Sequence, residues 1–263
     1  MSDETIQVLA ISGSLRKAAF STALLRATQE LAPEGMSIQI YTDLASIPPY
    51  DDDVRLAGYP PVVAALRDRV RAADALIFAT PEYNRSFSGV LKNAIDWVSR
   101  PPAQPLDGKP ATVMGAGPGA LGTALANYQL RQVLSVLSVH VVPGLEVLVG
   151  GAANKFDGQG RLLDEPTREF LTKSLVALMR LTRRLKYIQA CKIGGTRRVS
   201  FTCSLTTRHA CRVFHVGTRI ADEHAPVRHL DRTQRLGVER RIRRKQAVQI
   251  EDVSGDRIDV LVA

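Results

Sequence analysis

The chain has 263 residues, 45% of them hydrophobic, and a formal net charge of +9. This is enough apolar sequence for a full core without disulfide or metal support, and no run reaches the ~18 apolar residues that a membrane-spanning helix needs. The three cysteines form no CxxC pair, which disfavours a disulfide framework or a zinc site, and the acidic start MSDETIQ differs from a secretory signal, so we expect a cytoplasmic protein.

The positive charge is concentrated in the last part of the chain. Residues 1–186 carry 20 Lys and Arg against 18 Asp and Glu, whereas the remaining 77 residues carry 15 against 8. All three cysteines and four of the five histidines also lie beyond Lys186. This shift predicts a folded domain over residues 1–186 and a basic tail over residues 187–263.

Short apolar segments alternate with segments of helical periodicity along the predicted domain. Buried strands are expected at residues 5–12, 36–42, 74–80, 110–116 and 140–148. Apolar residues recur every three or four positions, as in helices that cover a core, at residues 21–32, 60–73, 88–100, 124–138 and 165–186. The alternation predicts an α/β fold, a doubly wound three-layer sandwich with a five-stranded parallel sheet and a ligand beyond the carboxyl ends of the strands.

The loop after the first expected strand, SGSLRK, has the chemistry of a phosphate site. Ser12 and Ser14 offer hydroxyls just before a helix, where backbone N–H groups favour an anion, and Arg16 can bind phosphate oxygens in bidentate fashion. The loop lacks the GK[ST] ending of a nucleoside-triphosphate site, so we expect a monophosphate. The alternative is a turn capped by the two serines, with Arg16 in solvent.

The loop after the third expected strand, PEYNRS, contains more polar chemistry than a connection requires. Pro81 favours extended backbone at Thr80 and stiffens the turn. Ser86 either orients this loop or caps the next helix, and Arg85 faces either an incoming phosphate or solvent. We interpret the loop as a ligand-binding segment.

The loop after the fourth expected strand, GAGPGALG, formally matches a dinucleotide fingerprint at Gly117, Gly119 and Gly122. Pro118 lies inside the motif, and the first strand of the chain already precedes a different phosphate loop, so the match is weak. The glycines are better interpreted as letting the backbone approach a flat ligand.

Together these segments resemble the NAD(P)H-dependent FMN reductases, in particular the bacterial branch that reduces quinones, azo dyes and chromate. The shared motifs, in the same order, are GSLRK, PEYNRS, LKNAIDW, PLDGKP and YQLRQVL. The resemblance covers about residues 5–186. It implies a flavodoxin-like fold, bound FMN, NADPH or NADH as co-substrate, small-molecule electron acceptors, and a homodimer or homotetramer, with no nucleic-acid or membrane partner.

The resemblance also assigns residues to the cofactor. Those expected to contact FMN are Ser12, Ser14, Leu15, Arg16, Ser21, Pro81, Glu82, Tyr83, Asn84, Arg85, Ser86 and Gly117. Catalytic side chains and metal ligands are not expected, because the flavin carries the redox chemistry. The nicotinamide would deliver hydride to the flavin and leave before the acceptor enters, which implies ping-pong kinetics. Ala19 stands where the family commonly has a serine, so one phosphate hydroxyl is missing.

Two other functions fit parts of the sequence. A flavodoxin-like electron carrier would bind FMN and pass electrons to a protein partner, but such carriers are usually strongly acidic, and residues 1–186 are near neutral. The basic run RRIRRK at residues 240–245 suggests nucleic-acid binding, although it lacks interleaved aromatic residues.

The tail shows poor hydrophobic periodicity, and its abrupt change in composition is what translation in a shifted reading frame would produce. We expect it to be poorly structured and dispensable. Its last residues could pair as a hairpin around Ser254 and Gly255, and its Cys and His residues match no common zinc spacing, the candidates being Cys203, His209, Cys211 and His215.

Overall fold

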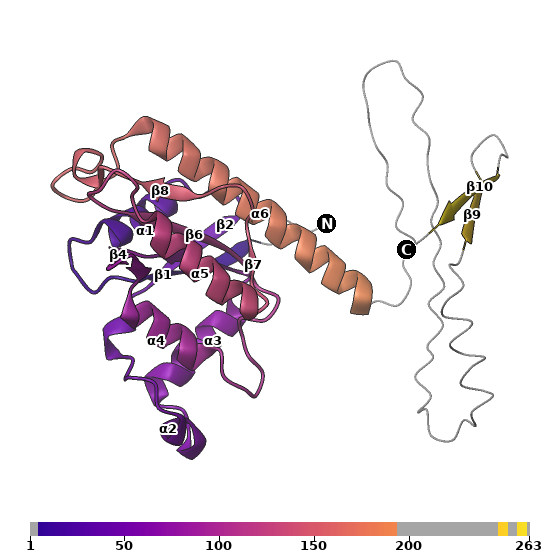
Figure 1. Ribbon diagram of the computed structural model, residues 1–263, viewed down its shortest axis with the longest axis horizontal. Coiled ribbons are helices and arrows are strands. Elements are labelled where there is room, and N and C mark those ends of the chain that lie inside the picture. The colour runs from indigo at the N-terminus through magenta and orange to yellow at the C-terminus, as the bar shows by residue number, and fades with distance from the viewer. Residues whose placement is uncertain (1–4, 194–246, 252–256, 262–263) are drawn as a thin grey trace. The chain divides into compact units, whose positions relative to one another are not determined.

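The computed structural model describes residues 5–193, 247–251 and 257–261 (Figure 1). The chain divides into two compact units, Met1–Ala190 and Cys191–Ala263. The first unit contains the predicted domain.

A parallel sheet forms the centre of the first unit. Its strands are β1 (Ile6–Ser12), β2 (Met36–Tyr41), β3 (Ala75–Ala79), β6 (Pro110–Ala116), β7 (His140–Val141) and β8 (Val147–Val149). The order is β2-β1-β3-β6-β7, and β8 also pairs with β6. This order is that of flavodoxin-like folds, so the predicted fold class is confirmed.

The fifth predicted strand is interrupted. Residues 140–148 form two short strands, β7 and β8, which pair with opposite ends of β6. Pro143 and Gly144 separate them; Gly144 has a φ of 71°, and Pro143 has no backbone N–H to donate to a neighbouring strand. The prediction of one continuous strand was therefore wrong in this detail.

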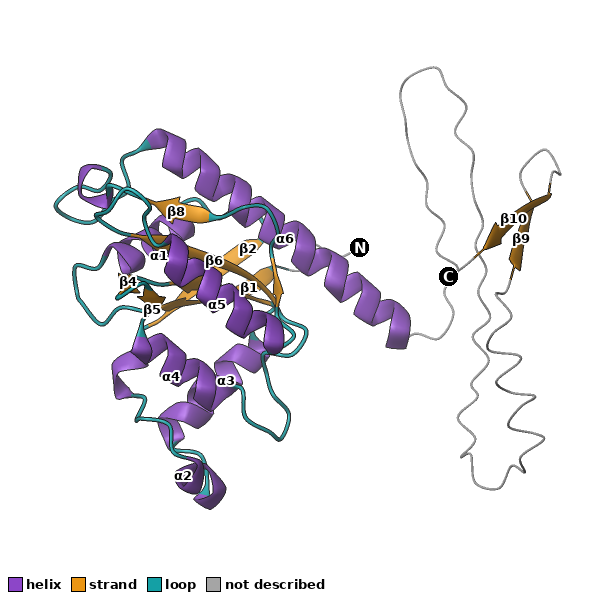
Figure 2. Cartoon of the chain, in the orientation of Figure 1, coloured by secondary structure: helices purple, strands orange, loops and turns teal. Residues whose placement is uncertain are grey.

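Helices cover both faces of the sheet (Figure 2). One face packs against α1 (Phe20–Glu30) and α6 (Glu165–Ile193). The other packs against α3 (Pro61–Ala72), α4 (Gly89–Val98) and α5 (Ala124–Val136). The three-layer arrangement is as predicted, except that α6 continues seven residues beyond Lys186.

Four short elements were not predicted within this unit. They are η1 (Leu44–Ser46), α2 (Asp52–Ala57), the hairpin of β4 (Glu82–Tyr83) with β5 (Ser86–Phe87), and η2 (Ala152–Asn154). Helix α2 is capped by Asp51, whose carboxylate accepts a hydrogen bond from the N–H of Asp53 at 2.9 Å. Each of these elements is too short to show a hydrophobic period in the sequence.

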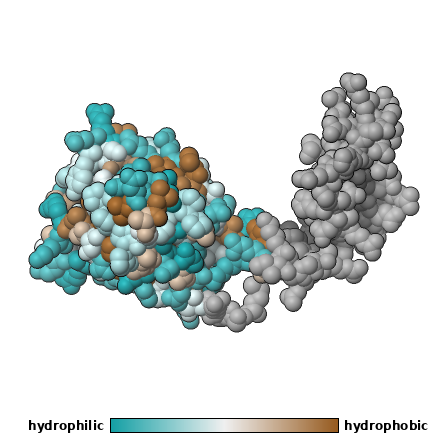
Figure 3. Space-filling model, turned by 90° about the horizontal axis from the view of Figure 1, so that it is seen from below, coloured by the Kyte–Doolittle hydropathy of each residue, from teal (hydrophilic) through white to brown (hydrophobic). Residues whose placement is uncertain are grey.

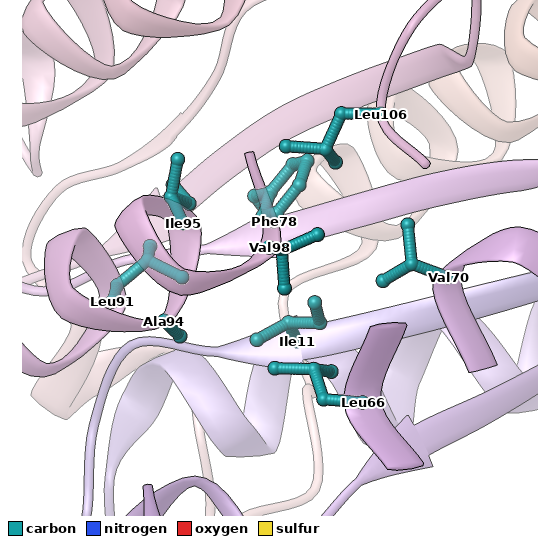
Figure 4. Close-up of a pocket in the computed structure, with 9 residues that line it drawn as sticks. All are labelled: Ile11, Leu66, Val70, Phe78, Leu91, Ala94, Ile95, Val98 and Leu106. Carbon is teal, nitrogen blue, oxygen red and sulfur yellow. The ribbon is translucent and has the colours of Figure 1, made fainter. Parts of the chain in front are cut away.

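The layer between the sheet and helices α3 and α4 is closely packed. Its largest fully buried side chains include Phe78 on β3 and Trp97 on α4. The cavity in this layer measures about 10 Å³, and Figure 4 shows apolar side chains from both helices and the sheet pointing into it. A space of this size holds no organic ligand, so the binding site lies elsewhere.

In the second unit, β9 (Ala247–Glu251) and β10 (Arg257–Leu261) form an antiparallel pair in which Val248 lies opposite Val260. These are the two segments that the sequence allowed to pair, and the turn at Ser254 and Gly255 lies outside the described residues. The candidate metal ligands Cys203, His209, Cys211 and His215 and the basic run at residues 240–245 lie outside the described residues.

No helix among the described residues has both the length and the apolar composition that crossing a membrane requires. The face of the first unit in Figure 3 is mainly hydrophilic, with hydrophobic patches separated by polar surface.

Candidate functional site

The three loops that the sequence singled out all begin at the carboxyl ends of neighbouring strands. Their first backbone N–H groups each bond to the next strand: Gly13 to the carbonyl oxygen of Ala79 at 2.6 Å, Thr80 to that of Met114 at 3.0 Å, and Gly117 to that of Val149 at 3.0 Å. The loops after β1, β3 and β6 are thereby held in neighbouring positions, as predicted for a ligand site at the carboxyl ends of parallel strands.

A groove of about 560 Å³ opens at these strand ends. Its lining residues come from the first loop, the β4–β5 hairpin and the start of α4, namely Gly13, Leu15, Arg16, Tyr83, Ser88, Gly89 and Val90. Leu15 and Tyr83 are about half exposed, at 52% and 51%. Large apolar side chains left open beside a groove suit a flat, partly apolar ligand.

The two serines of the first loop fix its shape. The Oγ atoms of Ser12 and Thr22 lie 2.8 Å apart, and the N–H of Ser14 donates to Ser12 Oγ at 3.3 Å. The N–H of Arg16 in turn donates to Ser14 Oγ at 3.4 Å. These contacts match the turn-capping interpretation of the serines, and they do not involve the guanidinium of Arg16, which makes no ion pair within the described part of the chain.

The start of α1 fits a phosphate group. Its N-cap residue is Ala19, which has no side-chain acceptor, and its first turn contains no acidic residue. Ser21 is only 2% exposed, yet its Oγ has no hydrogen-bond partner among the described residues. An anion at this position would meet helix N–H groups, a hydroxyl donor and the neighbouring Arg16.

Gly13 is needed for the close approach of the first loop to α4. A Cβ at this position would lie 2.8 Å from Ser88 Oγ and 3.3 Å from the carbonyl oxygen of Ala79. Ser88 is the N-cap of α4, and its Oγ accepts from the N–H of Leu91 at 3.4 Å. Any side chain at position 13 would therefore disturb this cap.

The PEYNRS segment is a tight hairpin with Asn84 and Arg85 at its turn. Their φ values are 50° and 64°, the left-handed region that type I′ hairpin turns require at both central positions. Asparagine tolerates this conformation, whereas arginine disfavours it. Of the two alternatives for Ser86, capping of α4 is excluded, because Ser88 occupies the N-cap position, and the hydroxyl of Ser86 instead bonds to Gln129.

Glu82 binds helix α5 through its side chain. Its Oε2 accepts from the N–H of Leu125 at 3.0 Å and from that of Ala126 at 3.1 Å. The N-cap residue of α5, Thr123, makes no capping hydrogen bond, so the Glu82 carboxylate takes this role from 43 residues away. At the helix N-terminus the negative charge is also favourable.

The remaining predicted residues are not among those that line the groove. The carbonyl of Pro81 accepts from the hydroxyl of Thr80 at 2.8 Å. The N–H of Gly117 already donates to Val149, so it is not available to a ligand ring. A Cβ at Gly117 would lie 3.0 Å from the carbonyl oxygen of Gly122, which indicates a packing role.

Sequence reasoning missed two parts of the site. The start of α4, with Ser88, Gly89 and Val90, lines the groove. The rule that a helix N-terminus after a strand-end loop can bind an anion was applied to α1, and applied to α4 it would have indicated these residues. The second is Gln129, whose side-chain amide bonds to the hairpin turn. The one sequence feature that could have indicated Gln129 is its place in the shared YQLRQVL motif.

Arg131 of the same motif has a structural role. Its guanidinium donates to Asn127 Oδ1 at 2.8 Å and to the carbonyl oxygen of Val142 at 3.1 Å. Burial lowers the pKa of Arg131 from its ordinary value. The residue thereby ties α5 to the segment between β7 and β8.

Comparisons with known proteins show which proteins this chain resembles. The family model described as NADPH-dependent FMN reductase matches residues 6–154. The chain is 53% identical over 186 residues to an NAD(P)H-dependent FMN reductase of Pseudomonas aeruginosa, which covers 71% of this chain and 100% of that protein. It is 41% identical over 185 residues to the quinone reductase of Escherichia coli K12, covering 70% of this chain and 98% of that one.

A solved structure gives the same result. The flavoenzyme FerB, an NAD(P)H:(acceptor) oxidoreductase from Paracoccus denitrificans, superposes with a TM-score of 0.63 at 34% identity. The match covers 68% of this chain and 98% of FerB.

Proposed function

The chain belongs to the NADPH-dependent FMN reductase family, and we propose that it binds FMN in the groove beside Arg16 and Tyr83 and reduces quinones at the expense of NAD(P)H. The observation that carries this proposal is the pairing of two features along one groove. Arg16 lines the groove and offers a charged donor for a phosphate, to which Ser21 at the start of α1 would add a hydroxyl from outside the lining; half-exposed Leu15 and Tyr83 in the groove offer apolar surface for a ring.

The protein's part in the reaction is to bind and orient. Arg16 would hold the phosphate by a charge-assisted hydrogen bond, and Ser14 and Ser21 would add neutral donors. Backbone groups of the β4–β5 hairpin would contact the ring, and Tyr83 would cover it from water. Bound FMN supplies two-electron redox chemistry, so no side chain needs to act as nucleophile or general base.

The open groove supports one shared position for donor and acceptor. We therefore propose ping-pong kinetics and a broad choice of acceptors, with azo compounds and chromate beside quinones. Double-reciprocal plots at several fixed quinone concentrations should give parallel lines. Intersecting lines would indicate a ternary complex and overturn the shared position.

We also propose a homodimer or homotetramer. Three apolar or aromatic residues just before α5 and in its first two turns are exposed in the single chain: Leu121 at 76%, Leu125 at 38% and Tyr128 at 50%. Burying them against a second copy would be favourable. Light scattering after size-exclusion chromatography tests this, and a monomer at all concentrations would contradict it. A cytoplasmic location, where reduced nicotinamide nucleotides are present, belongs to the same proposal.

The deciding experiment is an absorption spectrum of the purified protein followed by an assay. We expect a yellow protein with about one noncovalent FMN per chain and steady NAD(P)H oxidation when a quinone is added. A colourless protein that does not bind added FMN would refute the proposal. Bound FMN without steady quinone reduction would favour the electron-carrier alternative.

A further inference from the structure

Strand β4 is bonded to α5 through Glu82, and the turn of the β4–β5 hairpin is bonded to α5 through one side-chain amide, that of Gln129. Gln129 Nε2 donates to the carbonyl oxygen of Arg85 at 2.9 Å, and the hydroxyl of Ser86 donates to Gln129 Oε1 at 2.6 Å. One residue on α5 therefore binds both an acceptor and a donor of the turn. Both hydrogen bonds join residues more than 40 positions apart in the chain.

The turn needs this support because its own sequence does not favour its conformation. Both central residues have positive φ, and the second, Arg85 at 64°, stands where such hairpins usually have glycine. An arginine side chain makes left-handed backbone unfavourable. Contacts from outside the hairpin must then hold Arg85 in place.

The position of the turn determines the position of a groove residue. Tyr83 directly precedes Asn84, and its side chain lines the groove together with Leu15 and Arg16. If the turn relaxed to negative φ, the strand direction after Tyr83 would change, and the groove-facing backbone would move with it.

We infer that Gln129 is a positioning residue: it holds Arg85 in the left-handed conformation and thereby keeps the hairpin at the edge of the groove. This inference rests on the proposed binding of FMN in that groove. Gln129 itself is not among the residues that line the groove.

The first test compares Gln129→Met with Gln132→Met. Gln132 lies on the same helix, is exposed, and makes no side-chain hydrogen bond within the described part of the chain, so it controls for the change in helix composition. Flavin fluorescence on titration of apoprotein gives the Kd for FMN. We expect Gln129→Met to raise this Kd about tenfold, since two hydrogen bonds worth about threefold each are lost, and Gln132→Met to leave it unchanged.

The second test separates positioning from a general loss of helix stability. Glycine adopts positive φ without strain, so in the Arg85→Gly background the turn no longer depends on Gln129. Adding Gln129→Met there should change the Kd for FMN by less than about twofold, although the same change costs about tenfold when Arg85 is present. If Gln129→Met acted only by destabilising α5, it would raise the Kd for FMN by the same factor in both backgrounds.

A third readout does not require flavin. Trypsin cleavage of the Arg85–Ser86 bond in apoprotein, followed by mass spectrometry, should be several-fold faster in Gln129→Met than in Gln132→Met, because a released turn is a better substrate. Equal cleavage rates, equal FMN affinity of the two variants, or no rescue by Arg85→Gly would each overturn the inference. If wild-type protein binds no FMN, the proposed function fails, and the cleavage rates alone decide on the role of Gln129.

Discussion

Arg16 is the residue on which the proposed phosphate contact depends most. Its guanidinium makes no ion pair within the described residues, whereas the hydroxyls of Ser12 and Ser14 already take part in the loop's own hydrogen bonds. Loss of a charged donor is more costly than loss of a neutral one.

Arg16→Ala should therefore raise the Kd for FMN at least about tenfold, the effect of one charge-assisted hydrogen bond. Arg26→Ala is the matched control, because Arg26 is an exposed arginine on α1 that does not line the groove. Flavin fluorescence titration measures both. Equal affinity of the Arg16→Ala variant and wild type would remove Arg16 from the site.

Arg67 shows how a buried charge can be satisfied without a carboxylate. The side chain is 4% exposed, and its guanidinium donates to the carbonyl oxygens of Val98 at 2.7 Å, Arg100 at 3.0 Å and Pro102 at 3.0 Å. Its carbon Cζ also lies 4.3 Å from the centre of the Tyr59 ring. Burial lowers the pKa of Arg67, yet carbonyls at the C-terminus of α4 favour the cation.

Arg67→Met should destabilise the fold by about 3 kcal/mol, because several buried carbonyl groups lose their donor at once. Arg67→Lys should be intermediate, since an ammonium keeps the charge but not the planar fork of donors. Urea unfolding followed by circular dichroism gives the free energies. A loss below about 1 kcal/mol for Arg67→Met, the usual worth of one hydrogen bond, would mean that water replaces the guanidinium.

At the scale of elements, the start of α6 is stabilised by hydrogen bonds between residues close in sequence. The carboxylate of Asp164 accepts hydrogen bonds from the hydroxyl of Thr167 and, at 3.1 Å, from its backbone N–H. The hydroxyl contact is the main cause that lowers the pKa of Asp164 from its ordinary value of 3.8. Because the pKa is lower in the folded state, the stabilisation is complete above about pH 5 and is lost as the pH falls through the unfolded and then the folded-state value.

Asp164→Asn should lower the thermal midpoint by roughly 2 °C at pH 7, and this difference should shrink as the pH falls from about 5 to about 3. Asparagine still caps the helix but carries no charge. Thermal melts of wild type, Asp164→Asn and the exposed control Glu34→Gln over this pH range measure the effect. A difference that stays constant with pH would assign the cap to hydrogen bonding alone.

The elements that could be predicted are those whose sequence reflects their burial directly. Strands β3 and β6 are buried on both faces along their full length, so they appear as continuous apolar runs. The β4–β5 hairpin could not be predicted in this way. Its turn has no glycine, and what holds it, Glu82 on the amides of α5 and Gln129 on the carbonyl of Arg85, joins residues 43 and 44 positions apart.

In the candidate site too, features with a local sequence pattern could be predicted, and features that depend on distant residues could not. The proposed phosphate-binding loop is a local motif, so the sequence and its family resemblance indicate Arg16 and Leu15, and both line the groove. The role of Glu82 could not be predicted, because a glutamate at a loop suggests a ligand contact equally well. Its partner, the uncapped N-terminus of α5, becomes recognisable only when α5 packs beside the hairpin.

At the scale of the whole molecule, we propose that the reductase does not need residues 187–263. The similarity to the Pseudomonas aeruginosa reductase spans 186 residues and the full length of that protein. The last buried side chain of α6 among those described is Thr182, and residues 187–190 of the helix are exposed. Lys186, which pairs with Asp74 at 2.7 Å, is retained in a chain that ends there.

A variant that ends at Lys186 should keep its FMN, its quinone reductase activity and its thermal midpoint. A second variant that ends at Ile193 keeps all of α6 and serves as the control for shortening this helix. Spectra, activity assays and thermal melts of both variants and the full chain measure the effect. Loss of flavin in both variants would show that residues after Ile193 belong to the working enzyme, and reading the gene around codon 186 would test for a frame change.

From the interruption between β7 and β8 we expect a consequence for association at high protein concentration. An exposed strand edge can pair with another chain and start aggregation. On the β7 side the edge consists of strands of two and three residues with Pro143 between them, which leaves little for a second chain to pair with. The opposite edge is β2, six uninterrupted residues without a charge, so aggregation during refolding should begin there.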